Sequence, residues 1–219
     1  MSKKSKGSSK SQARRHPARN AVIVAVAAVL VLFGIYLVSR PGDNKAGGNA
    51  KAGAYSFQVG DPGTGKAAPP VTLTATDGST FDLAARQGKN TLLYFQEGVG
   101  CQPCWDQIVD IQKHRAQFHA MGIDDIVTIT GDPKSALSQK ATDDGVTIPV
   151  LSDPGLKVSR TYDANHYGMM GDSTDGHTFV LVGPDGTIRW RADYGGAPDF
   201  TMYVPVSNLL ADMRKGVGA

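Results

Sequence analysis

Short apolar runs, each bounded by glycine, proline or polar residues, recur along the chain from residue 68 onward. Runs of this length that are rich in aliphatic, β-branched and aromatic residues are typical of buried strands. Three such strands are predicted, at residues 91–95, 126–130 and 178–182. The turn at residues 184–186 predicts that residues 187–191 pair antiparallel with the third of them.

An Asp-Gly pair, Asp77-Gly78, interrupts the segment that runs from Val71 to Leu83. Because Asp-Gly is a preferred sequence for the tight turn of a β-hairpin, residues 71–83 are predicted to form one. Residues 55–59 are a further candidate for a short strand.

Helical periodicity follows the strand at residues 91–95. Trp105, Ile108 and Ile111 are spaced by three residues and give residues 102–120 an apolar stripe. Pro103 suits the first turn of this helix, where its missing N–H leaves no hydrogen bond unmade. Further helices are predicted at residues 132–142, 156–162 and 204–214. Because strands and helices alternate, the sequence predicts an α/β domain with helices on both faces of a central sheet.

Residues 21–38, AVIVAVAAVLVLFGIYLV, form an unbroken apolar run of 18 residues. About 20 apolar residues are usual for a helix that crosses a bilayer, so the run predicts one transmembrane helix. It is longer than the apolar core of a typical signal peptide, and no small-residue cleavage site follows it closely. We expect an uncleaved anchor, with a cleaved signal peptide as the alternative; both place the domain outside the cytoplasm.

Positive charge is concentrated before this apolar run. Residues 1–20 hold seven Lys and Arg residues and no acid, which predicts a basic, disordered tail that stays in the cytoplasm. The remaining residues carry 16 basic and 20 acidic side chains. A mildly acidic domain gives no reason to expect nucleic-acid binding.

Composition also sets the expected domain boundaries. Residues 39–67 are rich in Gly, Ala and Lys, which is typical of a flexible linker. The expected organisation is a tail at 1–20, an anchor at 21–38, a linker at 39–67 and one globular domain at 68–219, on the extracytoplasmic side of the cell membrane.

The sequence contains two cysteines, Cys101 and Cys104, separated by Gln102 and Pro103. The pair follows a predicted strand and opens a predicted helix. Free N–H groups and the dipole at a helix N-terminus stabilise a thiolate, so Cys101 is expected to be the nucleophile. Cys104 lies one turn further on, close enough for a disulfide. The motif predicts reversible dithiol–disulfide chemistry.

A structural disulfide, a zinc site and a chance pairing account for the cysteine pair less well. A purely structural disulfide over three residues closes too small a loop to stabilise the fold much. A zinc site needs four ligands, and no second cysteine pair is present; His114 and His119 lie on the helix that the pair already opens. A chance pair does not account for the strand–loop–helix context. No metal and no cofactor is expected.

Several segments accompany the cysteine pair in a fixed order: 68–73 (APPVTL), Asp77-Gly78, 92–95 (LLYF), 148–154 (IPVLSDP) and 178–186 (TFVLVGPDG). Together they resemble the thioredoxin superfamily, in particular the redoxin branch shared by alkyl hydroperoxide reductase/thiol-specific antioxidant (AhpC/TSA) proteins and membrane-tethered thiol–disulfide oxidoreductases. The likeness covers about residues 68–195. It implies a thioredoxin-like fold, with a central mixed β-sheet, helices on both faces and an N-terminal β-hairpin extension.

Two positions depart from the patterns of this superfamily. Peroxiredoxins resemble one another in a Pro-x-x-x-Thr/Ser-x-x-Cys signature, but here Gly98 stands at the Thr/Ser position and Tyr94 at the proline position. The groups that would hold a peroxide are therefore missing. Thioredoxins share a cis-proline facing the cysteines, whereas this chain has His177 and Thr178 there. With Trp105, these two residues are expected to face a partner protein.

Glu97, four residues before Cys101, is a candidate catalytic proton acceptor for the thiol. A solvated loop acid is the alternative.

Copper binding is a further alternative. His166, Met169, Met170 and His177 lie within twelve residues, and Met sulfur and imidazole both suit copper. The set resembles that of copper-delivering proteins of the same fold, which carry three residues between their cysteines rather than two. A methionine pair that covers the redox site is the preferred interpretation.

The leading hypothesis is an extracytoplasmic thiol–disulfide oxidoreductase, in which Cys101 exchanges first and Cys104 resolves the mixed disulfide. A thiol peroxidase, with Cys101 oxidised to sulfenic acid, is the second hypothesis, and a copper carrier is the third. The expected partners are protein thiols or disulfides outside the membrane and a membrane-bound or extracytoplasmic electron donor.

The charge asymmetry generates a prediction about topology. Because the basic tail is retained in the cytoplasm, residues 41–219 should lie outside. Protease added to intact spheroplasts should digest the domain, as followed by immunoblotting. A domain that resists protease until the cells are lysed would contradict this topology.

Overall fold

The computed structural model describes residues 52–218. The predicted tail at 1–20 and anchor at 21–38 lie outside these residues. Between residues 52 and 218, no helix is long and apolar enough to cross a membrane.

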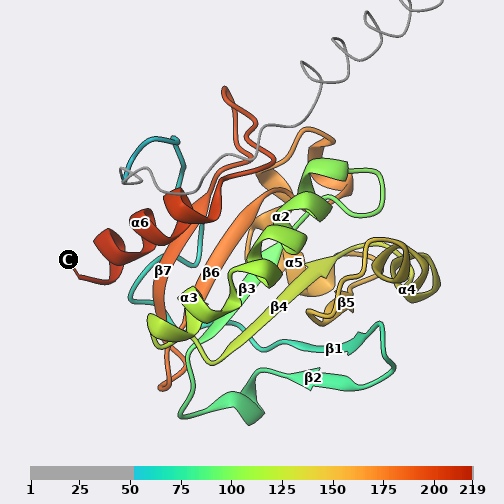
Figure 1. Ribbon diagram of the computed structural model, residues 1–219, viewed down its shortest axis with the longest axis horizontal. Helices are drawn as coiled ribbons and strands as arrows, with labels where there is room; N and C mark the ends of the chain where they lie inside the picture. Colours follow the sequence, from blue (N-terminus) through green and yellow to red (C-terminus); the bar gives the residue numbers. More distant parts are fainter. Residues whose placement is uncertain (1–51, 219) are drawn as a thin grey trace, which may run out of the picture. The chain divides into compact units, whose positions relative to one another are not determined.

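Seven strands form one mixed sheet in the order β2-β1-β5-β4-β3-β6-β7 (Figure 1). Their bounds are β1 Thr72–Ala75, β2 Thr80–Asp82, β3 Thr91–Phe95, β4 Asp125–Thr130, β5 Val150–Ser152, β6 Thr178–Val182 and β7 Ile188–Asp193. The strand β3 is central, parallel to β4 and antiparallel to β6. The predicted hairpin, β1–β2, is confirmed, and β1 joins it to the sheet by pairing antiparallel with β5.

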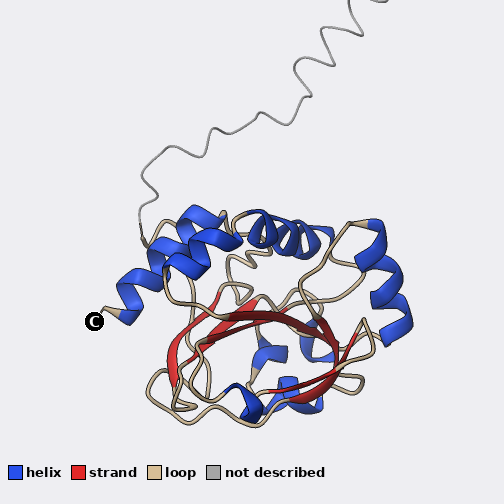
Figure 2. Ribbon diagram, turned by 60° about the horizontal axis from the view of Figure 1, so that its bottom comes forward, coloured by secondary structure: helices blue, strands red, loops and turns tan. Residues whose placement is uncertain are grey.

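The two faces of the sheet carry separate apolar cores. Leu92 and Tyr94 of β3 pack into one core with side chains from α2, α4 and α6, whereas Leu93 and Phe95 pack into the other. This alternation follows from the two-residue period of a strand. Figure 2 shows the longer helices in a row over one face of the sheet and shorter helices under the other. The predicted α/β architecture with helices on both faces is confirmed.

The helices follow the predicted order, with one break that the sequence did not reveal. Their bounds are α2 Gln102–Lys113, α3 Arg115–Ala120, α4 Lys134–Asp143, α5 Lys157–Thr161 and α6 Val206–Val217, with short 3₁₀ turns η1 Ala84–Arg86, η2 Ala164–His166 and η3 Gly171–Ser173. The single helix predicted at 102–120 is wrong, because it ends and restarts at His114. The ring Nδ1 of His114 lies 2.9 Å from the carbonyl oxygen of Asp110, and its backbone leaves helical geometry.

Two further predictions are corrected. Residues 150–152 were not predicted as a strand, yet β5 is buried beside β4. A strand of three residues gives too short a pattern to recognise. Residues 55–59 form no strand, and only Gln58 makes an isolated bridge, to Asp193.

The flexible linker predicted for 39–67 is wrong for residues 52–67, which pack on the domain. Gln58 and Asp193 exchange backbone hydrogen bonds of 3.0 and 2.9 Å, and Ala67 forms an isolated bridge with Thr187. The ring of Phe57 packs edge-on against Trp190. The sequence missed these contacts because each joins a single residue to a strand more than a hundred residues away.

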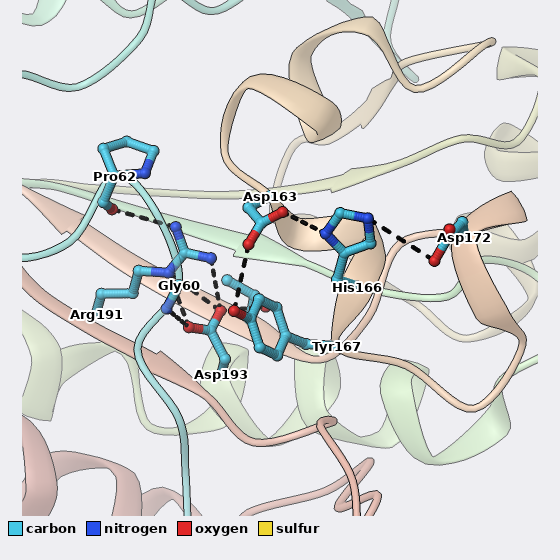
Figure 3. A network of polar contacts seen from close by, with 9 residues as sticks. Gly60, Pro62, Asp163, His166, Tyr167, Asp172, Arg191 and Asp193 are labelled. Carbon is cyan, nitrogen blue, oxygen red and sulfur yellow. Dashed lines mark hydrogen bonds and ion pairs between the residues drawn. The ribbon is translucent and has the colours of Figure 1, made fainter.

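A buried ion pair holds this segment to β7 (Figure 3). The Arg191 Nε and the Asp193 Oδ2 are 2.8 Å apart, and neither side chain is exposed to solvent. Asp193 also accepts hydrogen bonds from the backbone N–H of Gly60, at 2.7 Å, and from the Thr178 hydroxyl, at 2.7 Å. Arg191 donates to the carbonyl of Pro62 at 3.2 Å. The pair therefore joins the start of the domain to the sheet.

Replacing Asp193 with Ala should destabilise the fold strongly. The substitution leaves the Arg191 guanidinium buried and unpaired, which typically costs about 3–5 kcal/mol. Lys89→Ala is the control, because its ion pair with Asp125 is long, at 3.8 Å, and half-exposed; it should change the free energy of unfolding by about 0–1 kcal/mol. Denaturant unfolding of the two variants measures the difference, and equal losses would contradict a structural role for the pair.

Candidate active site

The cysteine pair lies where β3 ends and α2 begins. Phe95, the last residue of β3, is paired with Thr178, the first residue of β6. Residues 96–101, named the redox loop here, therefore emerge beside the start of β6. Cys101 is the N-terminal cap of α2, and Cys104 lies in its first turn.

Cys101 and Cys104 form a disulfide, with Cα atoms 5.3 Å apart. The backbone N–H of Cys104 also points at the Cys101 sulfur, 3.3 Å away. Cys101 retains 8% of its surface, whereas Cys104 has none. Of the two cysteines, only Cys101 therefore has surface that an incoming thiol or thiolate can contact. The roles predicted for the two cysteines, Cys101 as the first thiol and Cys104 as the resolving thiol, stay predictions.

Hydrogen bonds hold the redox loop from three sides. The N–H of Gly98 donates to Gln96 Oε1 at 2.6 Å, and the N–H of Val99 donates to Asp132 Oδ2 at 2.7 Å. The Trp105 indole donates to the carbonyl of Gly98 at 3.1 Å. A loop with this many defined partners presents the sulfur in one position, and neither Gln96 nor Asp132 was recognised from the sequence.

Gly98 cannot be exchanged for a hydroxyl residue without rearrangement of the loop. Its φ is +99°, a conformation that residues with a Cβ adopt only with strain. A Cβ at this position would overlap the Asp132 carboxylate and stand 2.9 Å from Thr130 Oγ1. The space in which a threonine or serine side chain would lie is already filled by Asp132 and Thr130.

Met202 covers the disulfide and was not recognised from the sequence. It forms a small buried cluster with Cys101 and Cys104. Met202 is nearly a hundred residues further along the chain and belongs to no motif, so no sequence signal pointed to it. Its thioether provides a polarisable, adaptable contact for the sulfurs.

The predicted partner-facing role of Trp105, His177 and Thr178 is wrong for their side chains, because all three are fully buried. Trp105 is fixed by its hydrogen bond to the redox loop, and the Thr178 hydroxyl donates to Asp193 at 2.7 Å. The sequence could not tell which way these side chains point.

His177 lies in an aromatic layer beneath the site. Its ring centroid is 5.1 Å from that of Tyr94, 5.2 Å from that of Phe179 and 6.2 Å from that of Tyr194. Burial lowers the pKa of His177 to about 3, with a smaller opposing effect from the backbone of Met202. The imidazole is therefore neutral at physiological pH.

Glu97 holds a neighbouring loop. Its Oε1 accepts hydrogen bonds from the backbone N–H groups of Met169 and Met170, the second at 3.3 Å. The carboxylate is half-buried at the end of β3. Glu97 thus has a structural role in addition to the catalytic role predicted from the sequence, and its action as a proton acceptor stays a prediction.

The residues proposed for copper are not gathered at one point. His166 is paired with Asp163, Met169 and Met170 are exposed, and His177 is fully buried. Within residues 52–218, no group of three or more His, Cys, Asp or Glu side chains is arranged to hold a metal ion.

The mixed sheet and the disulfide at the start of α2 define a thioredoxin-fold redox protein. The AhpC/TSA family model matches residues 64–191, more than half of the chain. The chain belongs to this family.

Relatives of two kinds match the chain. A Mycobacterium tuberculosis protein named as a peroxiredoxin is 32% identical over 130 residues, which cover 57% of this chain and 80% of that protein. The thiol-disulfide oxidoreductase ResA of Bacillus subtilis is 26% identical over 124 residues, which cover 57% of this chain and 64% of ResA. Both names describe oxidoreductases, and the chain is an oxidoreductase with a cysteine pair.

Solved structures show the same fold at low identity. PrxQ of Xylella fastidiosa gives a TM-score of 0.59 at 13% identity, covering 75% of this chain and all of that one. Peroxidoxin BcpB of Mycobacterium tuberculosis gives a TM-score of 0.58 at 18% identity, and the match covers 70% of this chain and 97% of BcpB. The thioredoxin-like fold that the sequence implied is confirmed.

The burial of His177 predicts a pH dependence of stability. In the unfolded chain its pKa returns to about 6.5. Between about pH 3 and 6.5 the unfolded chain binds a proton that the folded chain does not. The free energy of unfolding should therefore fall as the pH drops below 6.5, by up to about 1.4 kcal/mol per pH unit from this group. His177→Phe should remove this contribution, as measured by urea unfolding from pH 7.5 to 4.

Phe179→Leu is the control for that measurement. It disturbs the same aromatic layer without removing a titrating group, so it should lower the whole stability curve and leave its slope unchanged. An equal slope in the native protein and in His177→Phe would contradict the buried neutral imidazole.

Proposed function

We propose that the protein is a membrane-anchored thiol–disulfide oxidoreductase that exchanges disulfides with other proteins outside the cytoplasm. The observation that carries the proposal is the disulfide at the N-terminus of α2, in which Cys101 keeps 8% of its surface exposed and Cys104 keeps none. Exchange through a mixed disulfide requires an accessible sulfur and a second thiol within bonding distance, and this pair supplies both.

In the reducing direction, the exchange takes place in two displacements at sulfur. The Cys101 thiolate attacks one sulfur of a substrate disulfide, a mixed disulfide forms, and the other substrate sulfur leaves as a thiolate. The Cys104 thiolate then attacks the Cys101 sulfur, so the bond to the substrate breaks and the Cys101–Cys104 disulfide forms. The two substrate thiolates take up protons. Two electrons pass to the substrate, and a dithiol donor restores the protein by the same steps.

Peroxide reduction is the second candidate, favoured by the identity with a protein named as a peroxiredoxin. In that reaction the Cys101 thiolate attacks the peroxide O–O bond and becomes a sulfenic acid, while the leaving oxygen takes up a proton and departs as water. Cys104 then displaces the sulfenic oxygen as a second water and forms the disulfide. The rate depends on donors that stabilise charge on the first leaving oxygen.

The redox loop offers few such donors. The N–H groups of Gly98 and Val99 are already engaged by Gln96 and by the Asp132 carboxylate. A carboxylate in contact with the redox loop disfavours a negative charge that develops on an oxygen near it. Disulfide exchange needs neither donor, so the geometry supports exchange better than peroxide reduction.

The proposed location outside the cytoplasm rests on the apolar run at 21–38 and its basic flank. A domain fixed to the membrane would meet protein thiols and disulfides in the same compartment. Its electrons would be exchanged with a donor that is itself in the membrane or outside the cytoplasm.

The two candidate reactions predict different behaviour of the reduced protein. Losing one preorganised donor typically lowers a rate by about 10²–10³, so reaction with hydrogen peroxide should be slow and reaction with a disulfide fast. In cells, Cys104→Ser should accumulate mixed disulfides through Cys101, because the resolving thiol is absent. Non-reducing gels and stopped-flow kinetics measure the two properties.

Cys101→Ser is the matched control for the trapping experiment. It keeps one cysteine but removes the accessible one, so it should trap no partner. Peroxidase-like oxidation rates without any trapped protein would instead favour the thiol peroxidase.

A further inference from the structure

Large apolar side chains are exposed in an unusual concentration around the disulfide. Among the described residues, four of the six exposed large apolar side chains belong to segments that contact the redox pair or the loop that carries it. They are named the apolar rim here: Val99, Met169, Met170 and Phe200. The other two, Phe57 and Val59, lie on the segment that packs against β7.

Three members of the rim are held to the redox loop itself. Val99 belongs to that loop, two residues before Cys101. Met169 and Met170 are tied to it because Glu97 accepts hydrogen bonds from both of their backbone N–H groups. The two methionine side chains remain 60% and 63% exposed, so their fixed backbone presents them to solvent.

Phe200 completes the rim from the chain segment that ends at Met202. Its backbone N–H donates to the carbonyl of Gly196 at 3.1 Å, and Met202 packs on the disulfide. The φ of Phe200 is +45°, in the left-handed region, which is strained for a residue with a Cβ. The fold therefore holds an exposed aromatic ring in a strained conformation two residues from the side chain that covers the sulfurs.

Acidic groups surround the rim. The Asp132 carboxylate accepts a hydrogen bond from the backbone N–H of Val99. In the sequence, Asp172 lies two residues after Met170, and Asp199 directly precedes Phe200. Lys140 of α4 donates to Gln102 Oε1 at 2.8 Å and is paired with Asp144, also at 2.8 Å, so its charge is already matched by a carboxylate. The surface beside Cys101 is thus apolar with a negative border.

A groove lies along α2, and its lining includes Pro103. It has a volume of about 480 Å³ and is lined by Pro103, Asp106, Val109, Asp110, Lys113 and Tyr203. Burial raises the pKa of the Tyr203 hydroxyl, and its hydrogen bond to Asp110 and the charges of Asp110 and Asp106 raise it further. Asp106 and Asp110 thus bring two carboxylates, against the single lysine Lys113, to a groove whose lining includes the proline between the two cysteines.

We propose that the apolar rim and this groove bind the substrate polypeptide and select segments in which the reacting cysteine is flanked by large apolar residues and by Lys or Arg. The inference rests on the proposed function and names its substrate class. Large apolar residues beside the reacting cysteine of the substrate bury the side chains of the rim, and the rim's methionines adapt to different substrate side chains. A basic side chain complements the carboxylates beside and within the groove.

The test uses the reduced full-length protein in detergent micelles and three synthetic peptide disulfides. The peptides have apolar-basic, apolar-acidic and polar-basic flanks, and hydroxyethyl disulfide is the small reference substrate. The apolar-basic peptide should react about tenfold faster than each of the others, and its advantage over the acidic peptide should shrink at high salt.

Variants then assign the selectivity to the surface. In Met169→Ser/Met170→Ser, the rate with the apolar-basic peptide, divided by the rate with hydroxyethyl disulfide, should fall about tenfold. Asp106→Asn/Asp199→Asn should reduce the preference for the basic over the acidic peptide. Val59→Ser is the matched control, since it removes an exposed apolar side chain that does not belong to the rim or to the lining of the groove and should leave every rate unchanged.

The outcomes separate this inference from the function on which it rests. Equal rates for the three peptides, or an unchanged ratio in the methionine variant, would overturn the inference while exchange activity stands. Light scattering that shows a dimer dissolved by the methionine substitutions, without a change in peptide selectivity, would assign the rim to a second copy and also overturn it. Failure to reduce hydroxyethyl disulfide and all peptides would refute the proposed function itself.

Discussion

Burial of β3 on both faces and both edges determines where chemistry is possible in this protein. Its side chains enter the two apolar cores alternately, and its backbone groups pair with β4 on one side and β6 on the other. A strand whose polar groups are all paired has none left for a substrate. The chain leaves the sheet after Phe95, and Cys101 caps the N-terminus of α2, where the first backbone N–H groups of a helix have no partner within the helix.

The same constraint explains the many contacts of the redox loop. A chain that leaves a buried strand and starts a helix within six residues needs a sharp turn, and Gly98 supplies the positive φ. The N–H groups exposed by this turn are satisfied by Gln96 and Asp132. The contacts that make the loop rigid are thus the ones that occupy its donors, so rigidity and the lack of peroxide-binding groups have a common cause.

The sequence predicted the parts of the fold that depend on local pattern. The strands at 91–95, 126–130 and 178–182 have apolar runs of sufficient length, and the helix after the cysteines has a proline in its first turn. It did not predict side-chain direction at the site. His177 shares a face with Phe179 and so enters the aromatic layer, but that face is set by pairing with β3, which involves residues more than eighty positions away.

In the proposed function, a sulfur held in one position and flexible side chains around it suit disulfide exchange with different protein substrates. The position of Cys101 is fixed by the helix start and by the clamped loop, which favours in-line attack between sulfurs. The rim differs, because Met169 and Met170 are fixed only at their backbone, through Glu97, while their unbranched side chains are free to repack. In the proposed function, precise placement is confined to the reacting atom, and the adaptable side chains are the ones proposed to contact the rest of the substrate.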